Sequence, residues 1–320
     1  MPVERNPDTL KECSRFDRRT FVSLFGAAAA GAALAPNPLA AQAPSPITRL
    51  IPSTGERLPV IGMGSWITFH VGDNADERAV RVEILRQFFS RGGALIDSSP
   101  MYGLSEEVIG HCLERLGNPG ALFSATKVWT LGELLGISQM KHSEYLWGGD
   151  GFDLMQIHNL VDWQTHLKTL LRWKEEGRIR YIGVTTSHGR RHDELEQIVK
   201  SEPIDFVQLT YNIIDRQAEN RLLPAAADRA VAVIVNRPFR RGALPDRLKG
   251  KPLPAWAVEF GCENWPQFLL KFIVSHPHVT CAIPSTSRVD HMMENMGANF
   301  GRLPDMQTRR RMIRYVEEVI

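Results

Sequence analysis

Short apolar runs alternate with segments of helical period along most of the chain, and this alternation limits the fold more than any other feature. Eight runs are typical of buried strands: residues 60–63, 94–96, 121–123, 154–157, 181–184, 206–209, 231–235 and 279–283. Segments with a helical repeat of apolar residues lie between them, at 79–90, 106–116, 163–176, 195–200 and 268–275. Strands that alternate with helices predict a parallel α/β architecture.

Two parallel architectures are open to such a chain, a (β/α)8 TIM barrel and a doubly wound open sheet. Eight units in about 277 residues match the barrel. A dinucleotide-binding open sheet would carry a G-x-G-x-x-G turn after its first strand, and the sequence Gly-Met-Gly-Ser-Trp at 62–66 lacks that pattern. Residues 47–60 read as a β-hairpin with its turn at 53–55. We therefore predict an α/β (β/α)8 TIM barrel with an N-terminal β-hairpin cap over residues 44–320.

Residues 1–43 have the layout of an export signal. The pair Arg18-Arg19 precedes Phe21, and a stretch rich in alanine and glycine follows at 22–35, before small residues and prolines. This order resembles a twin-arginine-type signal, with cleavage expected near residues 42–44. A short helix of the folded domain is the alternative, but 27–33 has no polar face. We expect a periplasmic or otherwise exported protein that uses the twin-arginine export machinery, a route that carries folded, often cofactor-loaded, proteins.

Composition excludes several other classes of protein. The 320 residues contain 38 Lys plus Arg against 36 Asp plus Glu, and a net charge of +2 gives no electrostatic basis for binding nucleic acid. No apolar run reaches the roughly 20 residues that span a bilayer, so no stable membrane insertion is expected. The 4 cysteines are too few and too scattered for a disulfide framework or a zinc cluster, and no metal site is predicted.

Titratable residues stand at the ends of three successive predicted strands. Asp97, Lys127 and His158 are one β/α unit apart, and Tyr102 lies on the loop after Asp97. Singly, each has a structural explanation, such as a helix cap, a solvated amine or a buried imidazole. Chemistry in a barrel takes place at the C-terminal ends of the strands, where all four would meet. We predict that Asp97, Tyr102, Lys127 and His158 are catalytic.

This set of side chains suits the reduction of a carbonyl group, which needs a hydride on carbon and a proton on oxygen. Tyr102 would donate the proton, although a phenol has a pKa of about 10. A Lys127 cation would lower that pKa, Asp97 would hold the lysine, and His158 would orient the carbonyl. An aldolase with Lys127 as a Schiff-base nucleophile is an alternative, but it gives no function to Tyr102.

The sequence also resembles the aldo-keto reductase family. Residues 97–106 match its Asp-x-x-x-x-Tyr-Gly-x-Ser-Glu signature, and further matches follow in the family's order at 58–66, 124–127, 156–159, 177–184 and 283–287. The resemblance implies the same barrel, the same four catalytic residues and a nicotinamide cofactor across the mouth. It implies an NADP-dependent oxidoreductase that reduces aldehydes or ketones to alcohols, with NAD as the other option.

The resemblance also assigns cofactor contacts one by one. Asp97 would touch the nicotinamide ribose and Gln208 the carboxamide. Thr185 and Thr186 stand where the family usually has Ser-Asn, and Asn236 stands where it often has an aromatic ring stacked on the nicotinamide.

At the adenine end the matching segment contains Ser287, Arg288, His291, Glu294 and Asn295. Arg288 and His291, with Ser287 and the start of the next helix, would receive a 2′-phosphate, which favours NADP. A plain helix start with solvated charges is the alternative.

Two further features bear on ligands. Trp66 and Trp129 stand next to motif residues and are predicted to line the pocket for a small-molecule carbonyl substrate. Residues 239–264 form a predicted loop that folds over the cofactor with Arg240 and Arg241 near its pyrophosphate, or else an exposed basic loop. Because the aromatic platform is replaced by asparagine, a cofactor-binding regulatory or sensor barrel without turnover is the alternative function.

Overall fold

The computed structural model describes residues 45–149 and 151–320; the predicted signal segment, 1–43, lies outside them. Eight parallel strands form one sheet in chain order. They are β3 (Met63–Gly64), β4 (Leu95–Asp97), β5 (Phe123–Val128), β6 (Phe152–Ile157), β7 (Ile179–Thr185), β8 (Phe206–Thr210), β9 (Ala232–Asn236) and β10 (Cys281–Ala282).

The sheet closes on itself between its first and last strands. Ile61, just before β3, forms a parallel bridge with Ala282, and the Gly62 amide donates to the Ala282 carbonyl at 2.9 Å. Glycine is needed at this seam, because a Cβ at Gly62 would lie 2.9 Å from the Leu95 carbonyl oxygen. The predicted (β/α)8 barrel is therefore confirmed, and the open sheet is excluded.

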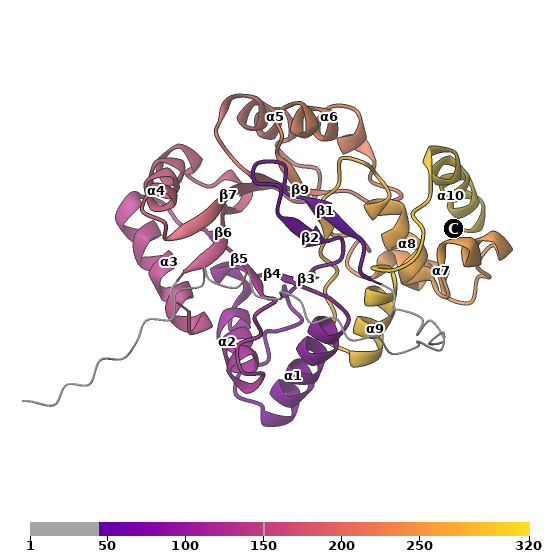
Figure 1. Ribbon diagram of the computed structural model, residues 1–320, viewed down its shortest axis with the longest axis horizontal. Coiled ribbons are helices and arrows are strands. Elements are labelled where there is room, and N and C mark those ends of the chain that lie inside the picture. Colours follow the sequence, from indigo (N-terminus) through magenta and orange to yellow (C-terminus); the bar gives the residue numbers. More distant parts are fainter. Residues whose placement is uncertain (1–44, 150) are drawn as a thin grey trace, which may run out of the picture. The chain divides into compact units, whose positions relative to one another are not determined.

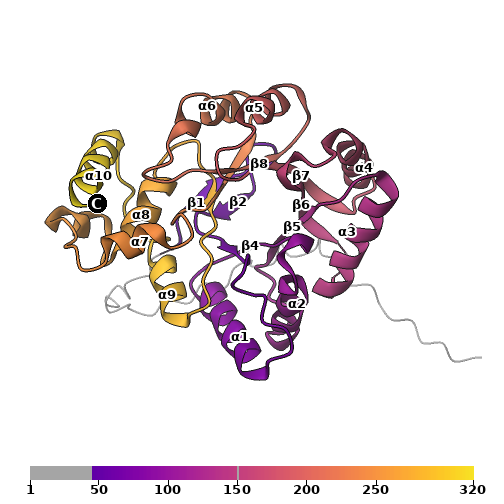
Figure 2. The ribbon, with the colours of Figure 1, turned by 180° about the vertical axis from the view of Figure 1, so that it is seen from behind.

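Helices surround the barrel on its outside (Figures 1 and 2). They are α1 (Ala75–Ser90), α2 (Ser105–Arg115), α3 (Glu133–Trp147), α4 (Trp163–Glu175), α5 (His192–Ser201), α6 (Leu222–Asp228), α7 (Ala243–Leu248), α8 (Trp265–Val274), α9 (Val289–Gly297) and α10 (Met306–Val319). Side chains define where several of them begin: the Asn264 side chain accepts from the Gln267 amide at 3.0 Å at the start of α8. In the described part of the chain, no helix combines the length and apolar character that crossing a bilayer requires.

The predicted hairpin cap is present as an antiparallel pair, β1 (Thr48–Leu50) and β2 (Arg57–Pro59). Ile51 and Leu58 from this hairpin are buried in the same cluster as inward side chains of the barrel strands. The Tyr181 hydroxyl on β7 lies 2.8 Å from the Thr54 Oγ1 of the hairpin turn. The hairpin thus closes the end of the barrel at which the strands begin.

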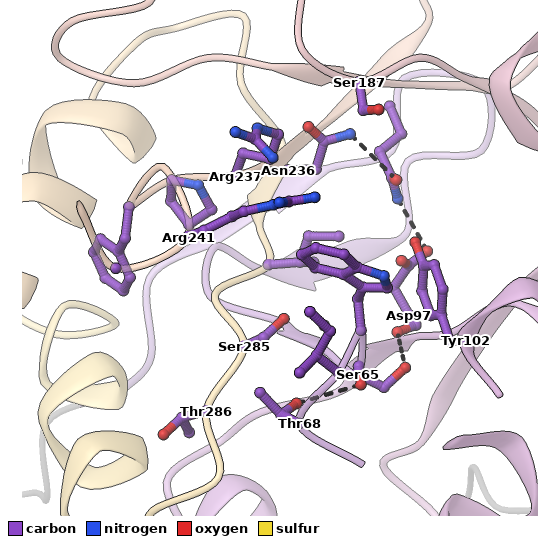
Figure 3. Close-up of a pocket in the computed structure, with 18 of the residues that line it drawn as sticks. Ser65, Thr68, Asp97, Tyr102, Ser187, Asn236, Arg237, Arg241, Ser285 and Thr286 are labelled. Atoms are coloured by element: carbon purple, nitrogen blue, oxygen red, sulfur yellow. Dashed lines mark hydrogen bonds between the residues drawn. The ribbon is translucent and has the colours of Figure 1, made fainter. Parts of the chain in front are cut away.

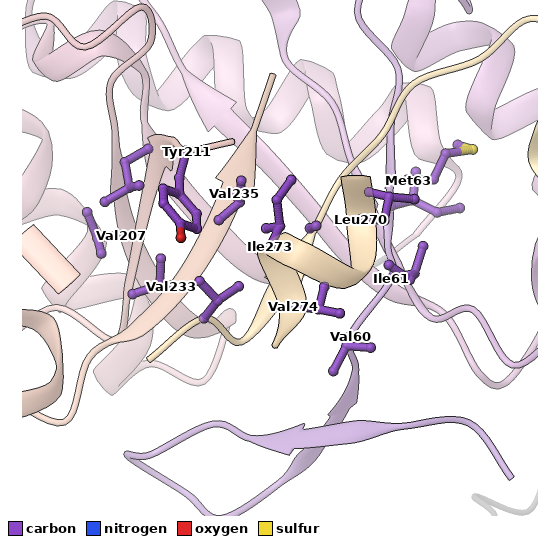
Figure 4. Close-up of a cluster of buried hydrophobic side chains, with 14 of the residues drawn as sticks. Val60, Ile61, Met63, Val207, Tyr211, Val233, Val235, Leu270, Ile273 and Val274 are labelled. Atoms are coloured by element: carbon purple, nitrogen blue, oxygen red, sulfur yellow. The ribbon is translucent and has the colours of Figure 1, made fainter. Parts of the chain in front are cut away.

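Alternation along each strand separates two apolar clusters. On β9, Ala232 and Ile234 belong to the cluster inside the barrel, whereas Val233 and Val235 belong to the cluster between strands and helices. Figure 4 shows this outer cluster where β8 and β9 meet α8, with Val235 beside Ile273. The inner cluster fills the interior of the barrel. Polar side chains therefore have room only at the C-terminal end of the strands.

Three parts of the sequence-based prediction differ from the structure. The third strand, expected at 121–123, is β5 at Phe123–Val128, because its polar residues are held in the site described below. Helices α3, α6 and α10 were not predicted. Segment 239–264, predicted as a loop, contains α7 and a 3₁₀ helix, η4 (Ala255–Phe260).

Candidate active site

Side chains along a strand point alternately into and out of the barrel, and this alternation positions the residues of the site. On β4, Leu95 points into the barrel, so Asp97 two residues later also points inward at the C-terminal end. The same step places Lys127 after Ala125 on β5 and Gln208 after Phe206 on β8. A layer of polar side chains therefore covers the inner apolar cluster, and each member comes from a different strand.

The Asp97 carboxylate is the centre of this layer. Its Oδ2 accepts from Lys127 Nζ at 2.6 Å, and its Oδ1 accepts from Gln156 Nε2 and Gln208 Nε2, both at 2.9 Å. Lys127 Nζ also donates to the Ser98 carbonyl at 2.7 Å. Burial lowers the pKa of Lys127, and the neighbouring Asp97 carboxylate opposes that shift. The lysine ammonium is thus held by two oxygen acceptors, the Asp97 carboxylate and the Ser98 carbonyl, beneath the cavity floor.

Tyr102 ends a 3₁₀ helix, η1 (Pro100–Tyr102), which begins where the Ser99 Oγ accepts from the Met101 amide at 3.2 Å. The Lys127 Nζ lies 5.2 Å from the centroid of the Tyr102 ring. Burial and the Asp97 carboxylate raise the pKa of Tyr102 well above its usual value. The expectation that Lys127 would lower this pKa is therefore not met, because burial of the phenol, with the Asp97 carboxylate beside it, raises the pKa. The phenol keeps its proton at neutral pH.

His158 follows β6 directly, and its ring meets the Tyr102 ring edge to face with centroids 5.6 Å apart. Burial and the Lys127 charge lower the pKa of His158 to about 2, so the imidazole is neutral. The Ser99 Oγ lies 2.8 Å from His158 Nδ1. That oxygen accepts from the Met101 amide and keeps its own hydrogen for donation to Nδ1, an arrangement in which the ring N–H is on Nε2.

A cavity of about 500 Å³ opens above this layer (Figure 3). Eleven residues from the sequence-based site and adenine-end predictions line it: Trp66, Asp97, Tyr102, His158, Thr185, Thr186, Gln208, Asn236, His291, Glu294 and Asn295. Four other predicted residues do not line the cavity. Lys127 is fully buried below it, and Trp129, Ser287 and Arg288 lie outside its lining. The cavity therefore runs from three of the four predicted catalytic residues, Asp97, Tyr102 and His158, to the predicted adenine end.

The amide of Asn236 joins the strand ends on the far side of the cavity. Its Nδ2 donates to the Thr186 carbonyl at 2.9 Å, and its Oδ1 accepts from the Thr210 Oγ1 at 2.7 Å. The Thr186 Oγ1 is buried and has no hydrogen-bond partner within residues 45–149 and 151–320. A hydrogen-bonded amide thus stands in this wall at the position where the family resemblance implies a stacking ring.

At the adenine end, Arg288 stands just before α9. Its guanidinium forms two hydrogen bonds with Asp290, Nε to Oδ1 at 3.0 Å and Nη2 to Oδ2 at 2.5 Å. His291 and Asn295 on α9 face the cavity, whereas Arg288 is held beside it. An anion arriving here would have to compete with Asp290 for Arg288.

The segment after β9 brings arginines to the cavity. Arg237 and Arg241 line it, as Figure 3 shows. The Arg241 Cζ lies 4.2 Å from the centroid of the Trp66 ring. Arg240, by contrast, pairs with Asp215 at 3.1 Å and lies outside the lining. In the described part of the chain, the ion pairs include neither Arg237 nor Arg241. Two free guanidiniums thus face this part of the cavity.

Sequence reasoning missed the residues that support the site from behind. Ser99 and Gln156 were not singled out, although both lie within the quoted motifs. Glu106, quoted only as the end of the signature, accepts from Ser143 Oγ at 2.8 Å and from Thr126 beside Lys127. The motif spacing was the available signal for each of them.

A parallel barrel that gathers an aspartate, a tyrosine, a lysine and a histidine at its mouth places proton-transferring groups where barrel enzymes carry out their chemistry. The model of the aldo/keto reductase family matches residues 60–312, and the chain belongs to that family.

Two curated relatives and one solved structure illustrate the similarity. Aldo-keto reductase YhdN of Bacillus subtilis (strain 168) is 25% identical over 213 residues, which cover 62% of this chain and 63% of that protein, less than two thirds of its length. Methylglyoxal reductase YeaE of Escherichia coli (strain K12) is 26% identical over 248 residues, 74% of this chain and 84% of that one. An aldo/keto reductase from Klebsiella pneumoniae, solved in complex with NADP and acetate, shares the fold with a TM-score of 0.69 at 24% identity, over 82% of this chain and 93% of that one.

Proposed function

We propose that the protein reduces aldehyde or ketone carbonyls to alcohols with NADPH, and that Tyr102 donates the proton. One observation carries this proposal: a protonated phenol and a neutral imidazole face the same end of a cavity that continues to His291 and Asn295. A cavity of about 500 Å³ has the size of a small-molecule or cofactor site.

The lining residues fit a dinucleotide. Thr185, Thr186 and Gln208 line the part of the cavity assigned to the nicotinamide half. The free guanidiniums of Arg237 and Arg241 suit the pyrophosphate, because guanidinium binds phosphate oxygens in a bidentate manner. The bound NADP of the Klebsiella pneumoniae protein supports the choice of cofactor. Asp290 competes for Arg288, so His291 is the more available group for a 2′-phosphate.

NADPH, when bound, supplies the hydride that goes to the carbonyl carbon. Tyr102 transfers its phenolic proton to the carbonyl oxygen as that oxygen gains electrons. His158 donates a hydrogen bond from Nε2 to the same oxygen and orients it without changing charge. The Lys127 ammonium, 5.2 Å from the Tyr102 ring, stabilises the phenolate that remains after transfer.

The burial of Lys127 argues against the two alternative functions. Its amine is fully buried and bound to Asp97 and the Ser98 carbonyl, so it is not available as a Schiff-base nucleophile. A regulatory barrel without turnover would have no need for an ammonium placed behind the tyrosine. Asn236 alone favours the regulatory function, and its hydrogen bonds to Thr186 and Thr210 hold it within the cavity wall.

Export through the twin-arginine route is part of the proposal, supported by Arg18-Arg19 and the alanine-rich stretch that follows. A folded protein exported in this way would carry its nicotinamide cofactor with it into the periplasm, where no free pool of reduced nicotinamide is expected. A purified periplasmic extract that contains only cofactor-free protein would count against this.

The first experiment is a fluorescence titration of the full chain with NADPH and with NADH, followed by turnover with simple aldehydes. Tighter binding of NADPH together with consumption of NADPH supports the proposal. Binding without turnover of any aldehyde or ketone would favour the regulatory barrel. Binding of neither cofactor would contradict both functions.

A further inference from the structure

Ser99 connects the two side chains that would meet the carbonyl oxygen of the substrate. It is fully buried and stands just before η1, the short helix that ends at Tyr102. Its Oγ lies 2.8 Å from the Nδ1 of His158 and accepts from the Met101 amide at 3.2 Å. Its carbonyl oxygen accepts from the Tyr102 amide at 2.9 Å. One buried residue thus contacts both the imidazole and the backbone that carries the phenol.

The imidazole of His158 needs such a partner, because a neutral ring carries a single N–H that either nitrogen can hold. Burial and the Lys127 charge lower the pKa of His158 to about 2, so the doubly protonated ring is absent at neutral pH. In the described part of the chain, the Ser99 Oγ is the only hydrogen-bond partner of this ring. His158 lines the cavity, and with Nδ1 directed at Ser99, Nε2 is the nitrogen left to contact a substrate.

The hydroxyl of Ser99 can distinguish the two tautomers because it is buried. Within residues 45–149 and 151–320, its hydrogen bonds are those to Met101 and His158 and no others. The Met101 amide occupies one lone pair of the oxygen, so among these residues the hydroxyl hydrogen has Nδ1 as its sole acceptor. If Nδ1 carried the N–H instead, the oxygen would accept twice and its buried hydrogen would have no acceptor. An unpaired buried donor disfavours that tautomer by about tenfold.

We propose that Ser99 is a positioning residue that selects the tautomer of His158 with the N–H on Nε2, and so makes the imidazole a donor toward the substrate oxygen. This inference rests on the proposed carbonyl reduction. Ser99 lies outside the cavity lining, so it acts through His158 rather than on the substrate. With the opposite tautomer, Nε2 would turn a lone pair toward the carbonyl oxygen, and the two acceptors would repel each other.

The direct test is nitrogen NMR of the full chain with isotope-labelled histidine, because the chemical shifts of the ring distinguish a protonated from an unprotonated nitrogen. Comparison with the His158→Gln variant assigns the signals of His158. We expect the N–H on Nε2 in the wild type and a mixture of the two tautomers in Ser99→Ala. Ser99→Thr keeps the hydroxyl and should restore the wild-type signals.

Ser105→Ala is the matched control for this comparison. Ser105 is also buried, and its Oγ donates to the Tyr102 carbonyl at 2.8 Å instead of contacting His158. Its loss therefore disturbs the same tyrosine segment without removing the partner of the imidazole. The tautomer of His158 should be unchanged in this variant.

Reduction rates give a second readout. In Ser99→Ala, kcat for pentanal with NADPH should fall at least about twofold, because half of the rings would carry the N–H on the wrong nitrogen if the tautomers became equally populated. The fall should reach at most about tenfold, the usual worth of one hydrogen bond. Since Ser99 acts through His158, Ser99→Ala should cause no further loss in the His158→Gln background. Any loss in Ser105→Ala should be the same in both backgrounds.

The inference is wrong if Ser99→Ala keeps the wild-type tautomer, or if the wild type itself carries the N–H on Nδ1. It is also wrong if the losses from Ser99→Ala and His158→Gln add, because a merely structural serine would give that result. If Ser99→Ala does not fold, Ser99→Cys takes its place with the same expected outcome, since a thiol is of similar size and a weaker donor. Failure of the proposed function would be seen separately, as no reduction of any aldehyde or ketone by the wild type. The NMR comparison would then still decide whether Ser99 selects the tautomer.

Discussion

Lys127 Nζ and Asp97 Oδ2 form an ion pair at 2.6 Å with the two side chains 0% and 2% exposed. A buried ion pair contributes little net stability, because removing both charges from water costs about as much as their attraction returns. The importance of this ion pair lies in its electrostatic effect on Tyr102. The carboxylate raises the pKa of Tyr102 before the reaction, and we expect the lysine cation to stabilise the phenolate that forms when Tyr102 gives up its proton.

The pH dependence of reduction follows from these charges. The pKa of Tyr102 is raised, so the proton donor stays loaded through the neutral range, and the pKa of His158 is lowered to about 2, so the imidazole stays neutral. We expect kcat/KM to be flat from about pH 5 to about pH 9 with regard to these two groups. Rates at saturating NADPH across that range measure it. If kcat/KM instead changed with pH near the usual pKa of histidine, and this change disappeared in the His158→Gln variant, the assignment of a neutral imidazole to His158 would be wrong.

The Asp97→Asn variant tests which group controls the alkaline side of this pH profile. It removes the carboxylate that raises the pKa of Tyr102, so the alkaline loss of activity should move to lower pH. The absorbance of tyrosinate, compared with the double variant that also carries Tyr102→Phe, reports the same titration without turnover. An unchanged or higher midpoint would mean that Asp97 does not control the phenol.

Tyr102→Phe tests the proton donor directly. Loss of the hydroxyl should lower kcat by about 10²- to 10⁴-fold, the usual contribution of a positioned acid. The dissociation constant of NADPH should stay within about twofold, because the hydroxyl acts on the substrate oxygen. Stopped-flow rates and fluorescence titration measure the two quantities. A variant that keeps most of its rate would show that another group supplies the proton.

The sequence was sufficient for the barrel because the alternation of apolar runs reports burial, and burial determines this fold. It also located Asp97, Tyr102 and His158 correctly at the cavity, since strand ends in a barrel converge. It could not give the direction of the Tyr102 pKa shift, which depends on distances between charges. It assigned Arg240 and Arg241 the same function, yet only Arg241 lines the cavity, because side-chain direction within a turn has no sequence period.

That difference between neighbouring arginines gives a cofactor prediction. Arg241→Met should weaken NADPH binding about tenfold, because it removes a free guanidinium that can pair with a phosphate oxygen. Arg240→Met is the control and should change binding by less than about twofold, since Arg240 already pairs with Asp215 outside the cavity. Fluorescence titrations at low and high salt measure both. Equal effects of the two variants would place the pyrophosphate elsewhere.

Export is tested by conservative changes at the twin arginines. Replacing Arg18 and Arg19 by lysine keeps the charge and the apolar stretch, so any loss of export reflects recognition of the arginine pair itself. We expect the full-length chain to accumulate in the cytoplasm, with the processed form absent from the periplasmic fraction on immunoblots. Arg5→Lys with Arg15→Lys, in the same polar segment, is the control and should leave export unchanged. If the Arg18, Arg19 variant still reached the periplasm in processed form, the twin-arginine assignment would be wrong. Retention of both variants would instead indicate that total arginine content matters.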